Sequence, residues 1–252
     1  MINPYDFTGR KILITGATSG IGESTAIKLS QQGAVLCLIG RSQERLDSTL
    51  SKLEGSGHMT FVKDLAQEGG YKEILDQAVS DGKKIDGFVH SAGISTVLPV
   101  SLLKKSTMDE SMTINFYSFA EICGLLSKKK YHDKASIVGV SSIAVDYPNK
   151  CLGTYAATKA AMNSLVKALA IELAEKDMRI NTVMPSSTRT RMLEEAFSGD
   201  KADNLQSILD KQVLGIAEPE DIADVIMFLL SDASRMITGR SVCVDGGFLN
   251  FI

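Results

Sequence analysis

The chain alternates between short apolar segments and longer segments with helical periodicity, and this alternation limits the possible folds more than any other feature. Seven short runs, rich in β-branched and apolar residues and bounded by turn residues, are Lys11–Thr15, Val35–Ile39, Thr60–Lys63, Gly87–His90, Ser136–Val140, Arg179–Val183 and Ser241–Val244. The stretches between them with apolar residues at helical spacing are Gly22–Gln32, Ser42–Leu53, Tyr71–Ser80, Met108–Lys129, Tyr155–Glu175 and Pro219–Leu230. Parallel neighbours in a sheet need a right-handed crossover, which places a helix on one sheet face. The pattern therefore predicts an α/β fold with a doubly wound, mainly parallel sheet and helices on both faces.

One segment interrupts this alternation. Residues Pro185–Gly215 are polar and charged and contain no clear strand, which is long for a connection in a compact domain. We predict a lid over a functional site, with a plain surface excursion as the alternative. No Pro/Ser-rich linker or internal repeat divides the 252 residues, so we expect one domain over residues 1–252.

The composition is that of a soluble globular protein, with 44% hydrophobic and 23% charged residues. Twenty-seven basic and 30 acidic residues give a net charge of −3, so there is no basic field for nucleic acid or an anionic membrane. Apolar runs such as Ala34–Ile39 are far shorter than the roughly 20 residues that span a bilayer. The first residues lack a basic and an apolar region, so we expect no secretory signal and a cytoplasmic protein.

The residue types that bind metals or form disulfides are scattered. No CxxC pair occurs, so we predict buried free thiols for Cys37, Cys123, Cys151 and Cys243. No metal-ligand spacing relates His58, His90 and His132, so we predict no metal site. A GxSxG nucleophile elbow is also missing from the sequence, which argues against an α/β-hydrolase.

The first predicted strand runs into a glycine-rich turn, Thr15–Gly22, with the sequence TGATSGIG. Glycines let the backbone approach a pyrophosphate, and the free N–H groups of the following helix favour its negative charge. The spacing is GxxxGxG rather than GxGxxG, and no Gly-Lys-Ser/Thr follows that would make a P-loop. The motif predicts a nucleotide site, although alone it is compatible with a structural turn.

The end of the second predicted strand bears on the choice of nucleotide. NAD-binding proteins usually have an acidic residue there, which bonds the ribose hydroxyls. This chain has Gly40 followed by Arg41, and a guanidinium can bind a 2′-phosphate. We therefore favour NADP(H) over NAD(H), with a solvated loop arginine as the alternative. Asp64 and Leu65, after the third strand, could border the adenine, although an Asp there is also an ordinary helix cap.

Tyr155 and Lys159 lie four residues apart in a helical stretch, so their side chains share one face. A nearby ammonium group and the positive nicotinamide ring of an oxidised cofactor both stabilise a phenolate. We therefore expect Lys159 and that ring to lower the pKa of Tyr155 and to make it an acid–base catalyst. Ser142 follows the fifth strand and could bond a substrate oxygen. The Tyr-x-x-x-Lys pattern alone is weak, because such pairs often only cover a helix surface.

Together these motifs resemble the short-chain dehydrogenase/reductase family over nearly the whole chain. The residues that carry the resemblance, in the family's order and spacing, are Thr15–Gly22, Ala92-Gly93, Asn115, Ser142, Tyr155, Lys159, Asn181, Pro185 and Val244–Gly247. The resemblance implies a Rossmann-type domain with seven parallel strands and a nicotinamide cofactor.

The resemblance also implies a catalytic tetrad. Tyr155 would donate a proton to the carbonyl oxygen, Ser142 would orient that oxygen, Lys159 would bond the nicotinamide ribose, and Asn115 would help to hold a proton relay. The implied cofactor-binding residues are Gly16, Thr18, Ser19, Gly20, Ile21, Gly22, Arg41, Asp64, Leu65, Ser91, Ala92, Gly93, Tyr155, Lys159, Pro185, Thr188 and Thr190.

Two positions depart from the family pattern. Asn-Asn-Ala-Gly is replaced by His90-Ser91-Ala92-Gly93, and Pro-Gly by Pro185-Ser186. We interpret His90 as a packed strand residue rather than a catalyst. Ser186 replaces a glycine beside the expected nicotinamide, so we expect it to reshape the entrance for the substrate.

The closest pattern within the family is that of 3-oxoacyl-acyl-carrier-protein reductases, so 3-oxoacyl thioesters are the leading substrate class. Alternatives are a sugar, a steroid or another secondary alcohol, and, from a different class, a non-catalytic nucleotide-sensing protein or an isomerase with tightly held cofactor. Lys128–Lys130 and Lys176 could contact an acidic acyl carrier protein, although cations are common at helix C-termini.

The predicted helix Tyr155–Glu175 has small or apolar residues around much of its circumference. Such a helix must be covered on two sides. We predict that a second subunit covers the outer side, in a homotetramer or homodimer, as the resemblance also implies.

Overall fold

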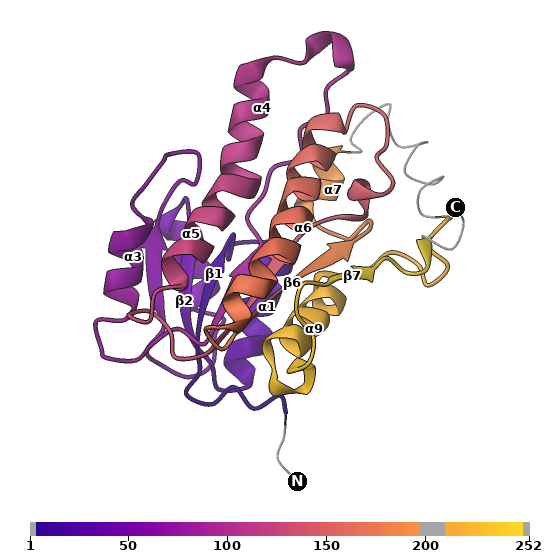
Figure 1. Cartoon of the computed structure of the whole chain (residues 1–252). Coiled ribbons are helices and arrows are strands. Elements are labelled where there is room, and N and C mark those ends of the chain that lie inside the picture. Colours follow the sequence, from indigo (N-terminus) through magenta and orange to yellow (C-terminus); the bar gives the residue numbers. More distant parts are fainter. Residues whose placement is uncertain (1–3, 197–209, 249–252) are drawn as a thin grey trace.

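The computed structural model describes residues 4–196 and 210–248 (Figure 1). Its seven strands are β1 (Lys11–Thr15), β2 (Val35–Gly40), β3 (Met59–Val62), β4 (Gly87–His90), β5 (Ala135–Val140), β6 (Met178–Pro185) and β7 (Ser241–Val244). They form one parallel sheet in the order β3-β2-β1-β4-β5-β6-β7. The predicted doubly wound α/β fold with one domain is confirmed, and β1, β4 and β7 have the predicted bounds.

The helices connect successive strands. The α-helices are α1 (Gly20–Gln31), α2 (Gln43–Leu50), α3 (Tyr71–Ala78), α4 (Lys105–Met112), α5 (Ser118–Leu126), α6 (Gly153–Ala174), α7 (Arg191–Ala196) and α9 (Pro219–Leu230). Short 3₁₀ turns are η1 (Val100–Leu102), η3 (Ile143–Val145) and η5 (Asp232–Ser234). The predicted continuous helix Met108–Lys129 is wrong in detail, because a π-helical turn, η2 (Thr113–Tyr117), separates α4 from α5.

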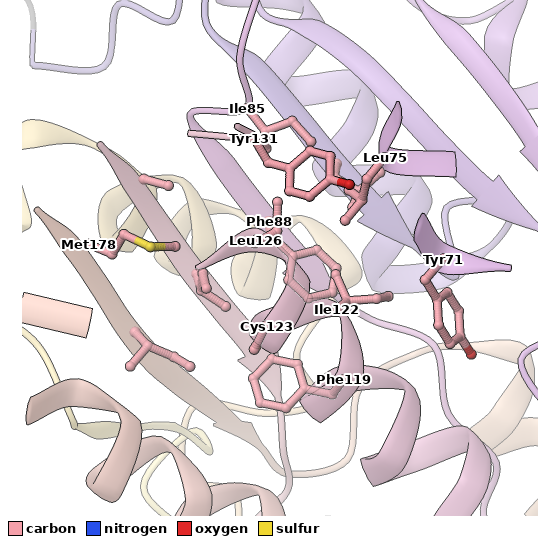
Figure 2. Close-up of a cluster of buried hydrophobic side chains, with 14 of the residues drawn as sticks. Tyr71, Leu75, Ile85, Phe88, Phe119, Ile122, Cys123, Leu126, Tyr131 and Met178 are labelled. Carbon is pink, nitrogen blue, oxygen red and sulfur yellow. The ribbon is translucent and has the colours of Figure 1, made fainter. Parts of the chain in front are cut away.

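Both faces of the sheet are buried, and alternate residues of a strand pack against helices on opposite faces. In β1, Leu13 joins a cluster with α3, α5 and α6, which includes Phe88 and Phe119 (Figure 2). Its neighbours Ile12 and Ile14 join a second cluster with α1, α2 and α9. This alternation is the two-residue period of a strand. Two helical layers therefore cover the two faces of the sheet.

Two cysteines differ from the sequence prediction. Cys37 and Cys123 are buried thiols as predicted, and burial raises the pKa of Cys37 to about 12. Cys151 and Cys243 are exposed, so the prediction is wrong for them. Cys243 lies in the edge strand β7, and Cys151 lies in the loop before α6, where neither helical layer covers it.

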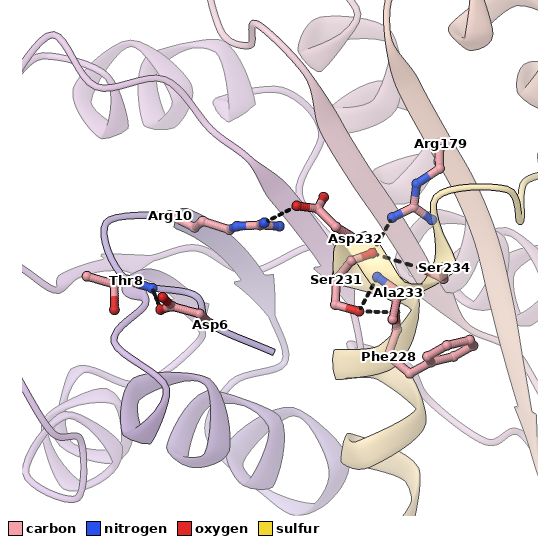
Figure 3. Close-up of polar contacts among 9 residues, drawn as sticks. All are labelled: Asp6, Thr8, Arg10, Arg179, Phe228, Ser231, Asp232, Ala233 and Ser234. Carbon is pink, nitrogen blue, oxygen red and sulfur yellow. Dashed lines mark hydrogen bonds and ion pairs between the residues drawn. The ribbon is translucent and has the colours of Figure 1, made fainter. Parts of the chain in front are cut away.

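The amino ends of the strands are closed by polar contacts between distant segments (Figure 3). Arg10, before β1, forms an ion pair of 2.6 Å with Asp232 in η5, and Arg179 in β6 donates to the Ser231 carbonyl at 3.0 Å. In the part of the chain that the structure describes, no helix combines the length and the apolar character needed to cross a bilayer.

Candidate active site

A cavity of about 860 Å³ lies at the carboxyl ends of the strands, where the strand order reverses between β1 and β4. This is the place where doubly wound sheets bind their ligands. Its wall contains the predicted Ser142, Tyr155 and Lys159 and most of the predicted cofactor residues. Two predicted residues, Gly22 and Asn115, lie behind the wall rather than in it, and both are buried.

The glycine-rich turn has the close approaches that its sequence suggests. Gly16 has a φ of +68°, and a Cβ on it would lie 2.6 Å from the backbone nitrogen of Ala92. A Cβ on Gly22 would lie 2.3 Å from the carbonyl oxygen of Gly16. Side chains at these positions would thus push the turn away from β4 and fill the base of the cavity.

The same turn leaves a helix terminus available for an anion. The N-cap residue of α1, Ser19, makes no capping hydrogen bond with its side chain, and it lines the cavity with Thr18 and Gly20. Uncapped N–H groups of a first helical turn favour phosphate oxygens. The turn and the helix therefore fit the pyrophosphate of a dinucleotide.

The far end of the cavity is basic. Arg41, Arg45 and Lys63 line it together with Asp64 and Leu65. Arg45 donates to the Thr18 carbonyl at 3.3 Å, so it links α2 to the glycine-rich turn. Arg45 and Lys63 were not found by sequence reasoning, although Arg45 lies one helical turn after Arg41. A Cβ on Gly40 would lie 2.7 Å from the Thr18 side chain, so an acidic residue at this position would require Thr18 to move.

The reactive side chains come from β5 and from the first turns of α6. Lys159 is buried, and its ammonium group donates to the Val140 carbonyl at 2.7 Å and lies 5.7 Å from the centroid of the Tyr155 ring. Ser142 forms a side-chain hydrogen bond with Tyr155 and accepts one from the Ala144 N–H at 3.1 Å. The predicted grouping of these three residues is present in the structure.

Burial dominates the acid–base properties of the pair. It raises the pKa of Tyr155 above its ordinary value, and the hydrogen bond with Ser142 opposes this only partly. Burial also lowers the pKa of Lys159 to about 8. Burial therefore raises the pKa of Tyr155 although the Lys159 ammonium lies nearby, and the lowering that we expect from Lys159 together with a bound oxidised nicotinamide stays a prediction.

Asn115 lies in the π-helical turn η2 and joins three segments. Its side-chain oxygen accepts from the Ile94 N–H at 2.8 Å, and its amide donates to the Ile94 carbonyl and to the Thr158 hydroxyl, both at 3.0 Å. A Cβ on Gly93 would lie 3.3 Å from the Asn115 oxygen and 3.4 Å from the Lys159 nitrogen. Asn115 thus fixes the loop after β4 against α6, next to Lys159. Sequence reasoning did not identify Thr158.

The two departures from the family pattern have different surroundings. His90 is buried, one ring nitrogen lies 2.9 Å from the Thr15 hydroxyl, and burial lowers its pKa to about 3. It is therefore a neutral packed residue, as we interpreted it. Ser186 lines the cavity, and its hydroxyl oxygen is buried without a hydrogen-bond partner in the described part of the chain.

Part of the cavity wall is apolar. Val97, Ile143, Leu152 and Met192 line it. Val145 packs against a separate cluster of Ile143, Met184 and Phe248. Residues 197–209 of the predicted lid lie outside the described residues, so the lid stays a prediction. Within residues 4–196 and 210–248, no group of three His, Cys, Asp or Glu side chains could hold a metal.

Comparisons with known proteins agree with this geometry. A family model described as "Enoyl-(Acyl carrier protein) reductase" matches residues 16–249. The chain is 31% identical over 249 residues to an L-xylulose reductase of Caenorhabditis elegans, covering 98% of both chains. It is 33% identical over 245 residues to the 3-oxoacyl-[acyl-carrier-protein] reductase FabG of Thermotoga maritima, covering 96% of this chain and 98% of that one.

A solved structure of a short-chain type dehydrogenase/reductase from Mycobacterium ulcerans superposes with a TM-score of 0.88 at 27% identity, covering 97% of this chain and 91% of that one. The sheet order, the glycine-rich turn and the Ser142, Tyr155 and Lys159 cluster are thus accompanied by similarity over almost the full length. The chain belongs to the short-chain dehydrogenase/reductase family, whose members use a nicotinamide cofactor to interconvert a secondary alcohol and a ketone.

Proposed function

We propose that the protein reduces a ketone to a secondary alcohol with NADPH, and that Asn115, Ser142, Tyr155 and Lys159 carry out the reaction. The observation that carries this proposal is the cluster of the Tyr155 and Ser142 hydroxyls with the Lys159 ammonium in the wall of one cavity. The cofactor would occupy the cavity from the basic end, along the glycine-rich turn, and when bound it supplies the hydride.

Tyr155 supplies the proton in this proposal. Because burial raises its pKa, the phenol is protonated at neutral pH and can donate to the carbonyl oxygen. The Ser142 hydroxyl is bonded to the same phenol and would hold the substrate oxygen beside it. Lys159, 5.7 Å from the Tyr155 ring, stabilises the phenolate left after the transfer. Asn115 positions Lys159 and the loop after β4 through the bonds to Ile94 and Thr158.

The basic end of the cavity supports NADPH over NADH. Arg41, Arg45 and Lys63 surround a position where a 2′-phosphate would make charge-assisted hydrogen bonds. Gly40 stands where a carboxylate would otherwise repel that phosphate. Arg41 is the residue that we assign to the 2′-phosphate, with Arg45 as a second contact.

The leading substrate class is a 3-oxoacyl thioester, which the 33% identity to a 3-oxoacyl-[acyl-carrier-protein] reductase supports. A keto-sugar is the second candidate, which the similarity to an L-xylulose reductase supports. An acyl carrier protein would bind near Lys129 and Lys176. Lys130 is already ion-paired with Asp76. Charge reversal at Lys129 and Lys176 should therefore raise KM for a carrier-linked substrate, and an unchanged KM would exclude that partner.

Two further features belong to the same proposal. Residues 185–215 would close over the bound substrate. The outer face of α6, where Ile171 is 76% exposed, would be covered by a second subunit in a homotetramer or homodimer. A monomer in sedimentation would contradict the second statement.

The test is the oxidation of NADPH, with NADH in parallel, in the presence of acetoacetyl-CoA, xylulose and plain ketones. We expect NADPH-selective turnover of at least one ketone. In Tyr155→Phe, kcat should fall by roughly 10²- to 10⁴-fold, because the variant lacks the proton that the reaction needs. NADPH binding should persist, since the substitution removes only the hydroxyl group. Full turnover in Tyr155→Phe would overturn the assignment of the proton donor.

A further inference from the structure

The wall of the cavity carries more positive charge than the cofactor accounts for. Among the described residues that line it, only Asp64 is acidic, whereas seven are basic. The basic residues are Arg41, Arg45, Lys63, Lys150, Lys159, Arg191 and Lys211. The proposed function assigns Arg41, Arg45 and Lys63 to the adenosine end of the cofactor. It assigns Lys159 to the reaction centre, and Arg191 adjoins the predicted cofactor contact Thr190. Lys150 and Lys211 have no such role.

Lys211 is held on the substrate side of the reaction centre. Its ammonium nitrogen lies 5.6 Å from the centroid of the Phe248 ring, which is a favourable cation–π distance. Phe248 is buried and packs against Ile143, the residue that follows Ser142. Lys211 therefore lies beside the apolar cluster that contains Ile143, which follows Ser142 in the sequence.

The backbone next to Lys211 is also fixed. Gln212 is only 3% exposed, and its side chain forms hydrogen bonds with both backbone groups of Ser187, each at 3.2 Å. Its amide group also donates to the Gly215 carbonyl at 3.1 Å. The start of the 210–215 segment is thus tied to the loop after β6, which gives Lys211 a defined place in the wall.

Lys150 lies in a different wall of the cavity, in the loop between η3 and α6. The carbonyl of the next residue, Cys151, accepts a hydrogen bond from the Leu98 N–H at 2.8 Å, so this loop is joined to the one after β4. Lys150 and Lys211 are exposed, and neither forms a hydrogen bond or an ion pair with another described residue.

We propose that Lys150 and Lys211 form an anion subsite in the substrate half of the cavity, and that the natural substrate carries a phosphate group in addition to its carbonyl. This inference rests on the proposed function and narrows its substrate class. Cations in the walls of a cleft concentrate the field inside it, and two ammonium groups suit a dianion better than a single carboxylate. The phosphate would belong to the coenzyme A part of a thioester or to the carbon chain of a sugar, because both carry phosphate groups with about two negative charges.

The experiment compares charged and neutral forms of the same ketone. One pair is acetoacetyl-CoA and S-acetoacetyl-N-acetylcysteamine, and the other is xylulose 5-phosphate and xylulose. Each is assayed for kcat/KM with NADPH and titrated by calorimetry into the NADP⁺-loaded protein. The proteins are the unchanged chain, Lys150→Gln, Lys211→Gln and the control Lys83→Gln. Lys83 is an exposed lysine before β4 at the opposite end of the sheet, so the control removes the same charge elsewhere.

We expect the phosphate-bearing member of one pair to have the higher kcat/KM, and that pair identifies the source of the phosphate. Lys150→Gln and Lys211→Gln should each lower this value about tenfold, as expected when one partly screened charge-assisted contact is lost. The neutral member should be unaffected, and so should both members with Lys83→Gln. Higher ionic strength should reduce the preference.

The subsite would be overturned if Lys150→Gln and Lys211→Gln lowered kcat/KM equally for the phosphate-bearing and neutral ketones. It would also be overturned if the unchanged chain did not prefer the phosphate-bearing ketone of either pair. Turnover of neutral ketones would then still support the proposed function. Conversely, calorimetric discrimination that depends on Lys150 and Lys211, without turnover of any ketone, would support the subsite and contradict the proposed function.

Discussion

Charged side chains are arranged differently at the amino ends and at the carboxyl ends of the strands. At the amino ends of the strands, charged side chains are paired with one another. Arg10 pairs with Asp232 at 2.6 Å (Figure 3). Lys11 pairs with Asp81 at 2.7 Å. At the carboxyl ends, seven basic residues line a cavity with one acidic residue among the described lining. Charge that is neutralised within the chain closes the fold, whereas an excess of basic over acidic side chains around a cavity attracts an anionic ligand. The comparison predicts that substitutions at one end change stability and that substitutions at the other change binding.

The largest effect on stability should come from Lys11, whose side chain is only 1% exposed and donates to the Ala78 carbonyl at 2.6 Å. Lys11→Ala should lower the free energy of unfolding by roughly 2–4 kcal/mol, because it leaves a cavity and an unpaired carbonyl. Lys11→Met should cost less than half as much, since it keeps the packing of the stem. Chemical denaturation measures both. An equal loss in the two variants would show that the charge, and not the packing, matters there.

The next largest effect should be a pH dependence of kcat/KM, caused by Lys159 at the carboxyl ends of the strands. Burial lowers the pKa of Lys159 to about 8, so its ammonium form is complete well below pH 8 and is lost above it. If this charge stabilises the phenolate of Tyr155, kcat/KM for reduction should fall up to about tenfold per pH unit above pH 8. In Lys159→Arg, which does not titrate in this range, the fall should disappear even if activity is lower. A profile that is flat between pH 7 and 10 in the unchanged chain would contradict this role.

Substitution of Arg41 tests whether the basic residues at the carboxyl ends of the strands bind a ligand. Arg41→Ser should lower kcat/KM for NADPH by roughly tenfold through a higher KM, because a charge-assisted contact with the 2′-phosphate is lost. The value for NADH should change little, and so should the midpoint of thermal unfolding. An equal loss of kcat/KM with NADPH and with NADH would show that Arg41 stabilises the glycine-rich turn and does not bind the 2′-phosphate.

The smallest effect should come from Arg10. The Asp232 side chain is 59% exposed, and exposed ion pairs contribute little. Arg10→Ala should change the free energy of unfolding by less than about 1 kcal/mol and leave the KM for NADPH unchanged. A loss well above this value, measured by denaturation, would show that the contacts around Asp232 and Arg179 act as one network.

The sequence by itself determined the strands, the glycine-rich turn and the main members of the site. Buried parallel strands appear as continuous apolar runs between turns, which is why β1, β4 and β7 have their predicted bounds. Tyr155 and Lys159 share a helix face through local spacing alone. Gly22 is needed for a local reason too, because a Cβ there would lie 2.3 Å from the Gly16 carbonyl oxygen, whereas Gly16 is needed because the distant Ala92 passes close to it.

Tertiary structure decided what depends on residues distant in the chain. The contacts of Asn115 with Ile94 and Thr158, the place of Lys211 over Phe248 and the exposure of Cys151 and Cys243 each require segments that only the fold brings together or leaves apart. The raised pKa of Tyr155 has the same origin, since α6 and the surrounding loops partly bury the residue in the cavity wall. Spacing along the chain determines which side chains share a helix face. Burial and long-range contacts determine the pKa values of those side chains, and both depend on tertiary packing rather than on sequence periodicity.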